Sequence, residues 1–221
     1  MLDKLLSFIA PHYCCSCDRI GRLLCDHCEN YILDEAKLIC LECTQPTAKM
    51  WLCESCRMPY ERAWAVGYRS GALQRLIGLY KFERAIEARE PLSKLITSVL
   101  PDLPPETIIV PIPTLPSHVR ERGYDHMMLI AKSVAKSRNL KLMPILKRKT
   151  HTKQRQANAT LRKQQAKRAF FVETKIDSDV PYLILDDVVT TGSTIKYASL
   201  ALKKAGAKHV WVAVVARQPL G

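Results

Sequence analysis

The stretch that decides the fold of this chain is YLILDDVVTTGST, residues 182–194. Its first four residues form a short apolar run bounded by Pro181 and two acids, which predicts a buried strand of a parallel sheet. Asp186 and Asp187 follow at the end of that strand. A hydroxyl-rich run then leads into residues 195–205, whose apolar spacing predicts a helix packed on the sheet. The stretch therefore predicts a strand, loop and helix unit of an α/β protein.

The loop of this unit has the chemistry of an anion cradle. A helix N-terminus offers unpaired backbone N–H groups, and Gly192 lets the main chain approach a phosphate closely. The two acids lie where ligands of open α/β sheets bind, and they can accept hydrogen bonds from sugar hydroxyls beside a magnesium ion. Phosphate and sugar diol together indicate a ribose 5-phosphate group. The predicted ligand residues are Asp186, Asp187, Val188, Thr190, Thr191, Gly192, Ser193 and Thr194, with Asp186 and Asp187 as the candidate catalytic pair.

The whole string resembles the signature that binds phosphoribosyl pyrophosphate (PRPP) in type I phosphoribosyltransferases. The resemblance implies a parallel-sheet, phosphoribosyltransferase-like domain that takes PRPP with Mg²⁺. A plainer interpretation is that the acids only end a strand and the hydroxyls only cap a helix. The string does not match GxxxxGK[ST], which argues against an ATPase P-loop.

Charge is unevenly distributed along the 221 residues, whose net charge is +13. Residues 1–60 hold 6 Lys/Arg against 8 Asp/Glu, whereas residues 61–221 hold 28 against 13. The basic part favours an anionic partner. The first ten residues lack the features of a signal peptide, and no run approaches the ~20 apolar residues that span a bilayer. The sequence therefore predicts a soluble cytosolic protein with a small first domain, 1–60, and a larger second domain, 61–221.

All nine cysteines lie within the first 56 residues, and eight of them form four Cys-x-x-Cys pairs. Two such pairs complete a tetrahedral zinc site, so four pairs predict two structural Zn²⁺ sites. Sequential pairing gives two successive zinc ribbons and is favoured, while a cross-braced arrangement would interleave the pairs. Disulfides and a redox motif fit a cytosolic protein with four repeats less well. The predicted ligands are Cys14, Cys17, Cys25, Cys28, Cys40, Cys43, Cys53 and Cys56, with Cys15 as a bystander.

Further elements of the second domain follow from apolar spacing. A strand begins near Trp64, a helix runs over 72–82, and a second helix is expected over 83–100. Buried strands are predicted over 107–112 and 209–216, with a helix over 127–137 between them. Arg120 and Arg122 fall in the predicted loop after the first of these strands. Arginine presents its donors in a rigid fork, so these two residues are candidates for binding pyrophosphate, although solvated loop arginines are an equal alternative.

The segment from Lys147 to Arg168 carries nine of the 13 Lys/Arg found in the acid-free stretch between Asp125 and Glu173. Almost nothing in it is apolar, so it cannot form a core of its own, and we expect a flexible loop over 147–168. It is either a flap that closes on PRPP, supplying Gln154, Arg155 and Arg162, or a track for nucleic-acid phosphates. A solvated charged loop is the plain alternative.

With these motifs named, the chain resembles the ComF family of competence proteins, which is related to the GntX-like proteins. The resemblance runs over nearly the whole length. It is carried by the four Cys-x-x-Cys pairs, Tyr80-Lys81-Phe82, Val110-Pro111-Ile112-Pro113, Arg122-Gly123-Tyr124, Gln154, Arg162, Ala169-Phe170 and the string from Leu185 to Thr194. Where the family pattern has Arg-Gly-Phe-Asn-Gln, this chain has Arg122-Gly123-Tyr124-Asp125-His126, and an Asn late in the basic loop is Gln165.

The resemblance implies a double zinc ribbon before a type I phosphoribosyltransferase domain. It also implies a role in natural transformation: handling incoming single-stranded DNA beside a helicase partner, at the cytosolic face of the membrane. The alternative function is a phosphoribosyltransferase of nucleotide salvage. The acid-free basic segment and the zinc ribbons favour the competence role, and no nucleobase-reading hood is recognisable.

Overall fold

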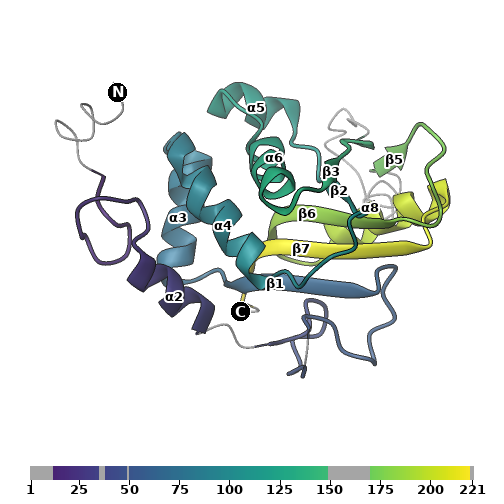
Figure 1. Cartoon of the computed structure of the whole chain (residues 1–221), viewed down its shortest axis with the longest axis horizontal. Coiled ribbons are helices and arrows are strands. Elements are labelled where there is room, and N and C mark those ends of the chain that lie inside the picture. Colours follow the sequence, from purple (N-terminus) through teal and green to yellow (C-terminus); the bar gives the residue numbers. More distant parts are fainter. Residues whose placement is uncertain (1–11, 35–37, 49, 149–169, 220–221) are drawn as a thin grey trace, which may run out of the picture.

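The computed structural model describes residues 12–34, 38–48, 50–148 and 170–219. Within these ranges, five strands form one parallel sheet in the order β1-β7-β6-β2-β3 (Figure 1). Their bounds are Arg62–Tyr68 for β1, Ile108–Pro111 for β2, Lys141–Leu142 for β3, Pro181–Val189 for β6 and His209–Arg217 for β7. The predicted α/β class with a parallel sheet is confirmed.

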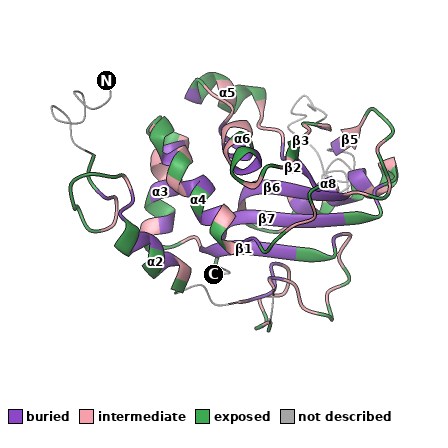
Figure 2. Ribbon diagram, in the orientation of Figure 1, coloured by how far each residue is buried: buried purple, intermediate pink, exposed green. Residues whose placement is uncertain are grey.

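Strand β6 lies in the middle of the sheet and is buried almost along its length, as Figure 2 shows. It pairs with β7 on one side, with Leu183 opposite Trp211, and with β2 on the other, with Leu185 opposite Pro111. Because both faces of a parallel sheet are covered, an apolar run such as residues 182–185 is stable there without alternation.

One face of the sheet is covered by three helices and by the first cysteine group. The helices are α3 (Gly71–Phe82), α4 (Arg89–Val99) and α6 (His126–Arg138), and Figure 1 shows them grouped together. Their buried apolar residues pack with Cys14, Cys28 and Ile32, the last two on helix α2 (Asp26–Asp34). The short elements η1 (Ile86–Ala88) and α5 (Pro116–Arg122) precede α4 and α6.

The opposite face is covered by α8 (Ser193–Ala205) and by the second cysteine segment. Ile195 and Leu202 of α8 belong to the same apolar cluster as Leu41 and Trp51. Helix α8 ends at Gly206, whose φ of 118° is one that L side chains rarely adopt. The two cysteine groups thus contribute to different sides of one sheet, while the predicted boundary at residues 60/61 stays a prediction.

A small antiparallel ribbon lies outside the main sheet. It pairs β4 (Leu146–Arg148) with β5 (Phe170–Val172), and Phe170 is buried. The first two residues of the predicted 147–168 loop, Lys147 and Arg148, are therefore in a strand. The rest of that loop, including Gln154, Arg155, Arg162 and Gln165, lies outside the described residues.

Three other expectations need correction. The key strand does not end before the acids but continues through Asp186 and Asp187 to Val189. The helix expected over 83–100 begins only at Arg89, because Arg84 has a φ of 57° and interrupts it. Arg120 and Arg122 are in helix α5 and not in a loop.

No helix within the described ranges combines the length and apolar character needed to cross a bilayer.

Candidate functional site

The two acids of β6 form the centre of the candidate site, and both are 8% exposed. Asp187 receives two charged or polar partners from distant segments. Lys81, on the last turn of α3, places Nζ 2.6 Å from Asp187 Oδ2, and His126 places Nε2 2.7 Å from the same oxygen. Asp186 has a different environment: among the residues that the structure describes, its Oδ1 accepts one hydrogen bond, from the backbone N–H of Asp187 at 2.9 Å. The two neighbouring acids therefore have unlike surroundings.

This difference separates the acidities of the pair. Burial, and then the charge of Asp187, raises the pKa of Asp186 to about 8. Burial also acts to raise the pKa of Asp187, but the His126 hydrogen bond and the Lys81 charge outweigh it and hold that pKa well below its ordinary range. At neutral pH Asp187 is therefore ionised and Asp186 is largely protonated when no ligand is bound.

His126 is part of a hydrogen-bonded chain that fixes its ring. The guanidinium of Arg122 lies 2.8 Å from His126 Nδ1, and a guanidinium can only donate. The ionised carboxylate of Asp187 can only accept, so His126 Nε2 carries a proton and donates to it. His126 is only 6% exposed and Arg122 only 8%, and the Tyr80 hydroxyl donates to the His126 carbonyl at 2.9 Å. Arg122 thus positions His126 instead of being a solvated loop residue.

The hydroxyl-rich loop lies directly after β6 and opens helix α8. Gly192, at the N-cap of α8, has a φ of 73°, a left-handed conformation that favours glycine. Thr191 and Ser193 are exposed, and their hydroxyl oxygens are 3.0 Å apart. The loop therefore presents hydroxyls and the N-terminus of a 13-residue helix to solvent.

Arg217 forms hydrogen bonds with the backbone at the start of this loop. It is 2% exposed, and its Nη1 donates to the carbonyl oxygens of Val189, at 3.1 Å, and of Thr190. Arg217 ends β7, and these contacts are to loop backbone. Its charge therefore fixes the start of the cradle.

A cavity of about 190 Å³ connects the acids to the start of α8. Of the predicted site residues, Asp186, Asp187, Val188, Thr194 and Arg122 line it. Arg120 is exposed on α5 and is not among the lining residues. Sequence reasoning did not assign a role to four basic or histidine residues that also line it: Lys81, His118, His126 and Arg148.

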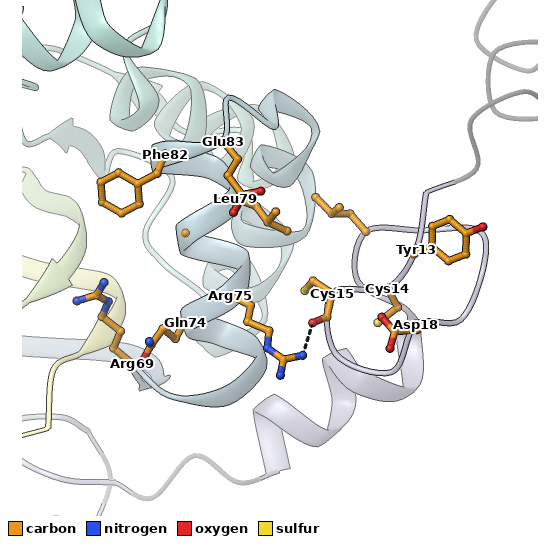
Figure 3. A pocket seen from close by; sticks show the side chains of 12 residues that line it. Tyr13, Cys14, Cys15, Asp18, Arg69, Gln74, Arg75, Leu79, Phe82 and Glu83 are labelled. Atoms are coloured by element: carbon orange, nitrogen blue, oxygen red, sulfur yellow. Dashed lines mark hydrogen bonds between the residues drawn. The ribbon is translucent and has the colours of Figure 1, made fainter.

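A larger hollow, of about 510 Å³, lies between the first cysteine group and α3. Figure 3 shows Arg75 of α3 reaching across it, where Nη1 donates to the Cys15 carbonyl at 3.2 Å. Phe82 and Tyr13 are its exposed aromatic residues. The hollow contains neither the acid pair nor the cradle, so we place the candidate site in the smaller cavity.

The cysteines form two four-membered groups in sequential order. The groups are Cys14, Cys17, Cys25 and Cys28, and Cys40, Cys43, Cys53 and Cys56. In each, the four sulfur atoms lie within 4.8 Å of one another, and the sulfurs of Cys17 and Cys25, like those of Cys43 and Cys53, are 3.6 Å apart. Sulfurs bound to tetrahedral zinc at about 2.3 Å would be roughly 3.8 Å apart. Both groups therefore fit structural zinc, the sequential pairing is confirmed, and Cys15 belongs to neither group.

Comparison with known proteins gives relatives along most of the chain. No family model matches. Competence protein F of Haemophilus influenzae is 30% identical over 181 residues, covering 75% of this chain and 78% of that protein. Competence protein ComFC of Streptococcus pneumoniae is 23% identical, covering 89% and 84%. DNA utilization protein YhgH of Escherichia coli K12 is 29% identical, covering 79% and 83%.

This chain is an α/β protein with two four-cysteine groups near its N-terminus, and its relatives are named for competence or DNA utilization. This chain belongs to the ComF family. Among solved structures, an allosteric regulatory enzyme of purine biosynthesis matches 57% of this chain at 17% identity with a TM-score of 0.42. A glutamine PRPP amidotransferase from B. subtilis gives 0.41 over 57%, and the chain covers 25% of each of these enzymes.

Proposed function

We propose that this chain is a competence factor that binds PRPP with Mg²⁺ at the end of β6 and handles single-stranded DNA. One observation carries the first part: a buried, unequal acid pair lies beside a glycine-containing helix N-terminus and in the same cavity as Lys81, Arg122 and Arg148. The loop and helix supply donors for the 5′-phosphate. The acids accept from the ribose hydroxyls, and the cations face the pyrophosphate.

The competence role is supported by the relatives, which are named competence proteins and DNA utilization proteins. The DNA part is also supported by charge. Residues 61–221 have 28 Lys/Arg against 13 Asp/Glu, with nine of the bases between Lys147 and Arg168. Cations of this density bind phosphate backbones with an affinity that falls steeply with salt.

Thermal unfolding in the presence of different ligands tests the ligand class. Ligands that bind only the native state raise the melting temperature, by an amount equivalent to about 2.7 kcal/mol at 100 times Kd. We expect PRPP with Mg²⁺ to give the largest increase, with smaller increases from ribose 5-phosphate and from pyrophosphate. An equal response to PRPP and to free nucleobase, or no response to PRPP, would contradict the proposal.

The DNA part needs its own measurement. Fluorescence anisotropy of labelled single-stranded DNA, recorded across a salt series with and without PRPP and Mg²⁺, should show binding that weakens as salt rises. If binding of single-stranded DNA is absent, or does not change with salt, the proposal that this chain handles DNA is contradicted. Release of pyrophosphate from PRPP only when a free nucleobase is added would instead favour a phosphoribosyltransferase of nucleotide salvage.

A further inference from the structure

The second cysteine group lies at the same edge of the sheet as the candidate cradle. Thr44, next to Cys43, lines a hollow of about 430 Å³ together with Tyr68, Ser70 and Pro219, which follow or end β1 and β7. The ring of Trp51 packs edge-on against Tyr68 with centroids 6.3 Å apart. The carboxyl ends of β1, β6 and β7 meet at one edge of a parallel sheet, so this segment is a neighbour of the loop after β6.

One side chain of this segment reaches the cradle itself. A Cβ atom built on Gly192 would lie 2.8 Å from Glu42 Oε2, and the other nearby atom is also from the Glu42 carboxylate. Gly192 is the N-cap of α8, so the carboxylate lies against the residue that opens the predicted phosphate site. The two residues are far apart in the chain, and the fold brings them together.

The position of Glu42 is fixed by its neighbours. It lies between Cys40 and Cys43, two members of the second cysteine group. Leu41, which precedes it, is 1% exposed and belongs to the apolar cluster that contains Ile195 of α8. Glu42 is itself half-buried, and its carboxylate has no hydrogen bond or ion pair with any of the described residues. The carboxylate therefore lies against the cradle without an ion pair to any described residue.

A carboxylate at this place has two electrostatic consequences. It is attracted by the positive end of the helix dipole, just as a phosphate is. It also repels a phosphate, because two anions a few ångströms apart in a partly buried site interact unfavourably. Glu42 and a ligand phosphate are attracted to the same positive end of α8, so the two compete for it.

We propose that Glu42 is an autoinhibitory residue of the cradle, and that its carboxylate and the 5′-phosphate of the ligand exclude each other. The proposal rests on the proposed function, because it assumes that a sugar phosphate binds at the loop after β6. It goes further by making the second cysteine group a regulator of that site. Whatever moves Glu42 away from Gly192 raises the affinity for the sugar phosphate, and the sugar phosphate displaces Glu42 by the same coupling.

The test compares full-length, zinc-loaded proteins with and without the Glu42 carboxylate. Glu42→Gln keeps the shape of the side chain and removes its charge, and Glu42→Ala removes the side chain as a second variant. Glu54→Gln is the matched control, because Glu54 is an exposed acid between two cysteines of the same group. Zinc content and far-ultraviolet circular dichroism establish that each variant is folded.

Calorimetric titration uses three probes: PRPP with Mg²⁺, ribose 5-phosphate, and inorganic pyrophosphate. We expect Glu42→Gln to bind PRPP and ribose 5-phosphate at least about tenfold more tightly than the unchanged protein. The Glu54→Gln affinity should stay within about twofold of the unchanged protein, and the pyrophosphate affinity should be the same in all proteins.

Equal or weaker binding of ribose 5-phosphate by both Glu42 variants would overturn the autoinhibitory contact and leave PRPP binding intact. An equal gain in Glu54→Gln would also overturn it, because the effect would then be one of general charge. Absence of PRPP binding in every protein would remove the proposed function and this inference together.

Discussion

His126 and Asp187, 61 residues apart in the chain, are joined by a hydrogen bond of 2.7 Å between Nε2 and a carboxylate oxygen. The same oxygen lies 2.6 Å from Lys81 Nζ, so one buried acid links α3, α6 and β6. This arrangement keeps Asp187 ionised and leaves Asp186 largely protonated. Asp187 can therefore accept a ligand hydroxyl or cation directly, whereas Asp186 must first lose its proton.

The ion pair of Lys81 with Asp187 should contribute to stability, because the two side chains are only 18% and 12% exposed. We expect Lys81→Met to lower the free energy of unfolding by about 3 kcal/mol, since it leaves a buried acid with one partner fewer. Urea denaturation measures this change. Lys132→Met, on the exposed side of α6, is the control and should change stability by no more than about 0.5 kcal/mol. Similar effects of the two substitutions would contradict the pairing.

PRPP affinity should depend on pH through Asp186. Its pKa is raised to about 8 in the free protein, by burial and then by Asp187, and the ligand hydroxyls and Mg²⁺ favour the ionised form. Binding therefore releases a proton below pH 8, and affinity should rise by up to about tenfold between pH 7 and 8 and level off above that. Affinity in Asp186→Asn should be weaker and flat over this range. A flat profile in the unchanged protein would show that Asp186 is already ionised.

Metal content should follow the two sequential cysteine groups. The unchanged protein should contain two zinc ions per chain, and Cys40→Ser should lose the ion of the second group. Because Leu41 and Trp51 of that segment are buried in the core, loss of the metal should also reduce stability. Cys15→Ser is the control and should retain both ions. Elemental analysis decides the matter, and loss of zinc in Cys15→Ser would contradict the assignment.

Arg217 should matter to the cradle without touching the ligand. Arg217→Met would leave the carbonyl groups of Val189 and Thr190 without their charged donor, which should cost about 2 kcal/mol of stability. PRPP affinity should fall as well, because the start of the loop is no longer held. Arg62→Met is the control: Arg62 is exposed and lies over the Trp211 ring at 5.0 Å. Unchanged PRPP affinity in a folded Arg217→Met protein would contradict this role.

The strand, loop and helix around residues 182–205 were predictable because their signals are local. An apolar run, a glycine among hydroxyls and a periodic helix each lie within a few residues of one another. The four Cys-x-x-Cys pairs were recognisable for the same reason, since the spacing within each pair is local. Which two pairs share a site is not a local signal: sequential pairing was favoured and a cross-braced arrangement stayed open until the structure showed the two groups.

The contacts of the acid pair were not predictable in this way. Lys81 and His126 are separated from Asp187 by long stretches of chain, and a single sequence carries no signal for such a contact. The sequence therefore assigned no role to His126. Helix α5 was predicted as a loop although the sequence held local signals for a helix. Pro116 stands in its first turn, and Gly123, with a φ of 86°, ends it.

The most direct measurement is isothermal titration of the full-length, zinc-loaded protein with PRPP in the presence of Mg²⁺. The predicted result is one site per chain, dependent on Mg²⁺, and weakened at least about tenfold by Asp186→Asn. Asp179→Asn, which changes an exposed acid paired with Lys208, should leave the affinity unchanged. No heat from the folded protein, or equal affinity in Asp186→Asn, would contradict the claim that this acid pair and its loop bind a sugar phosphate.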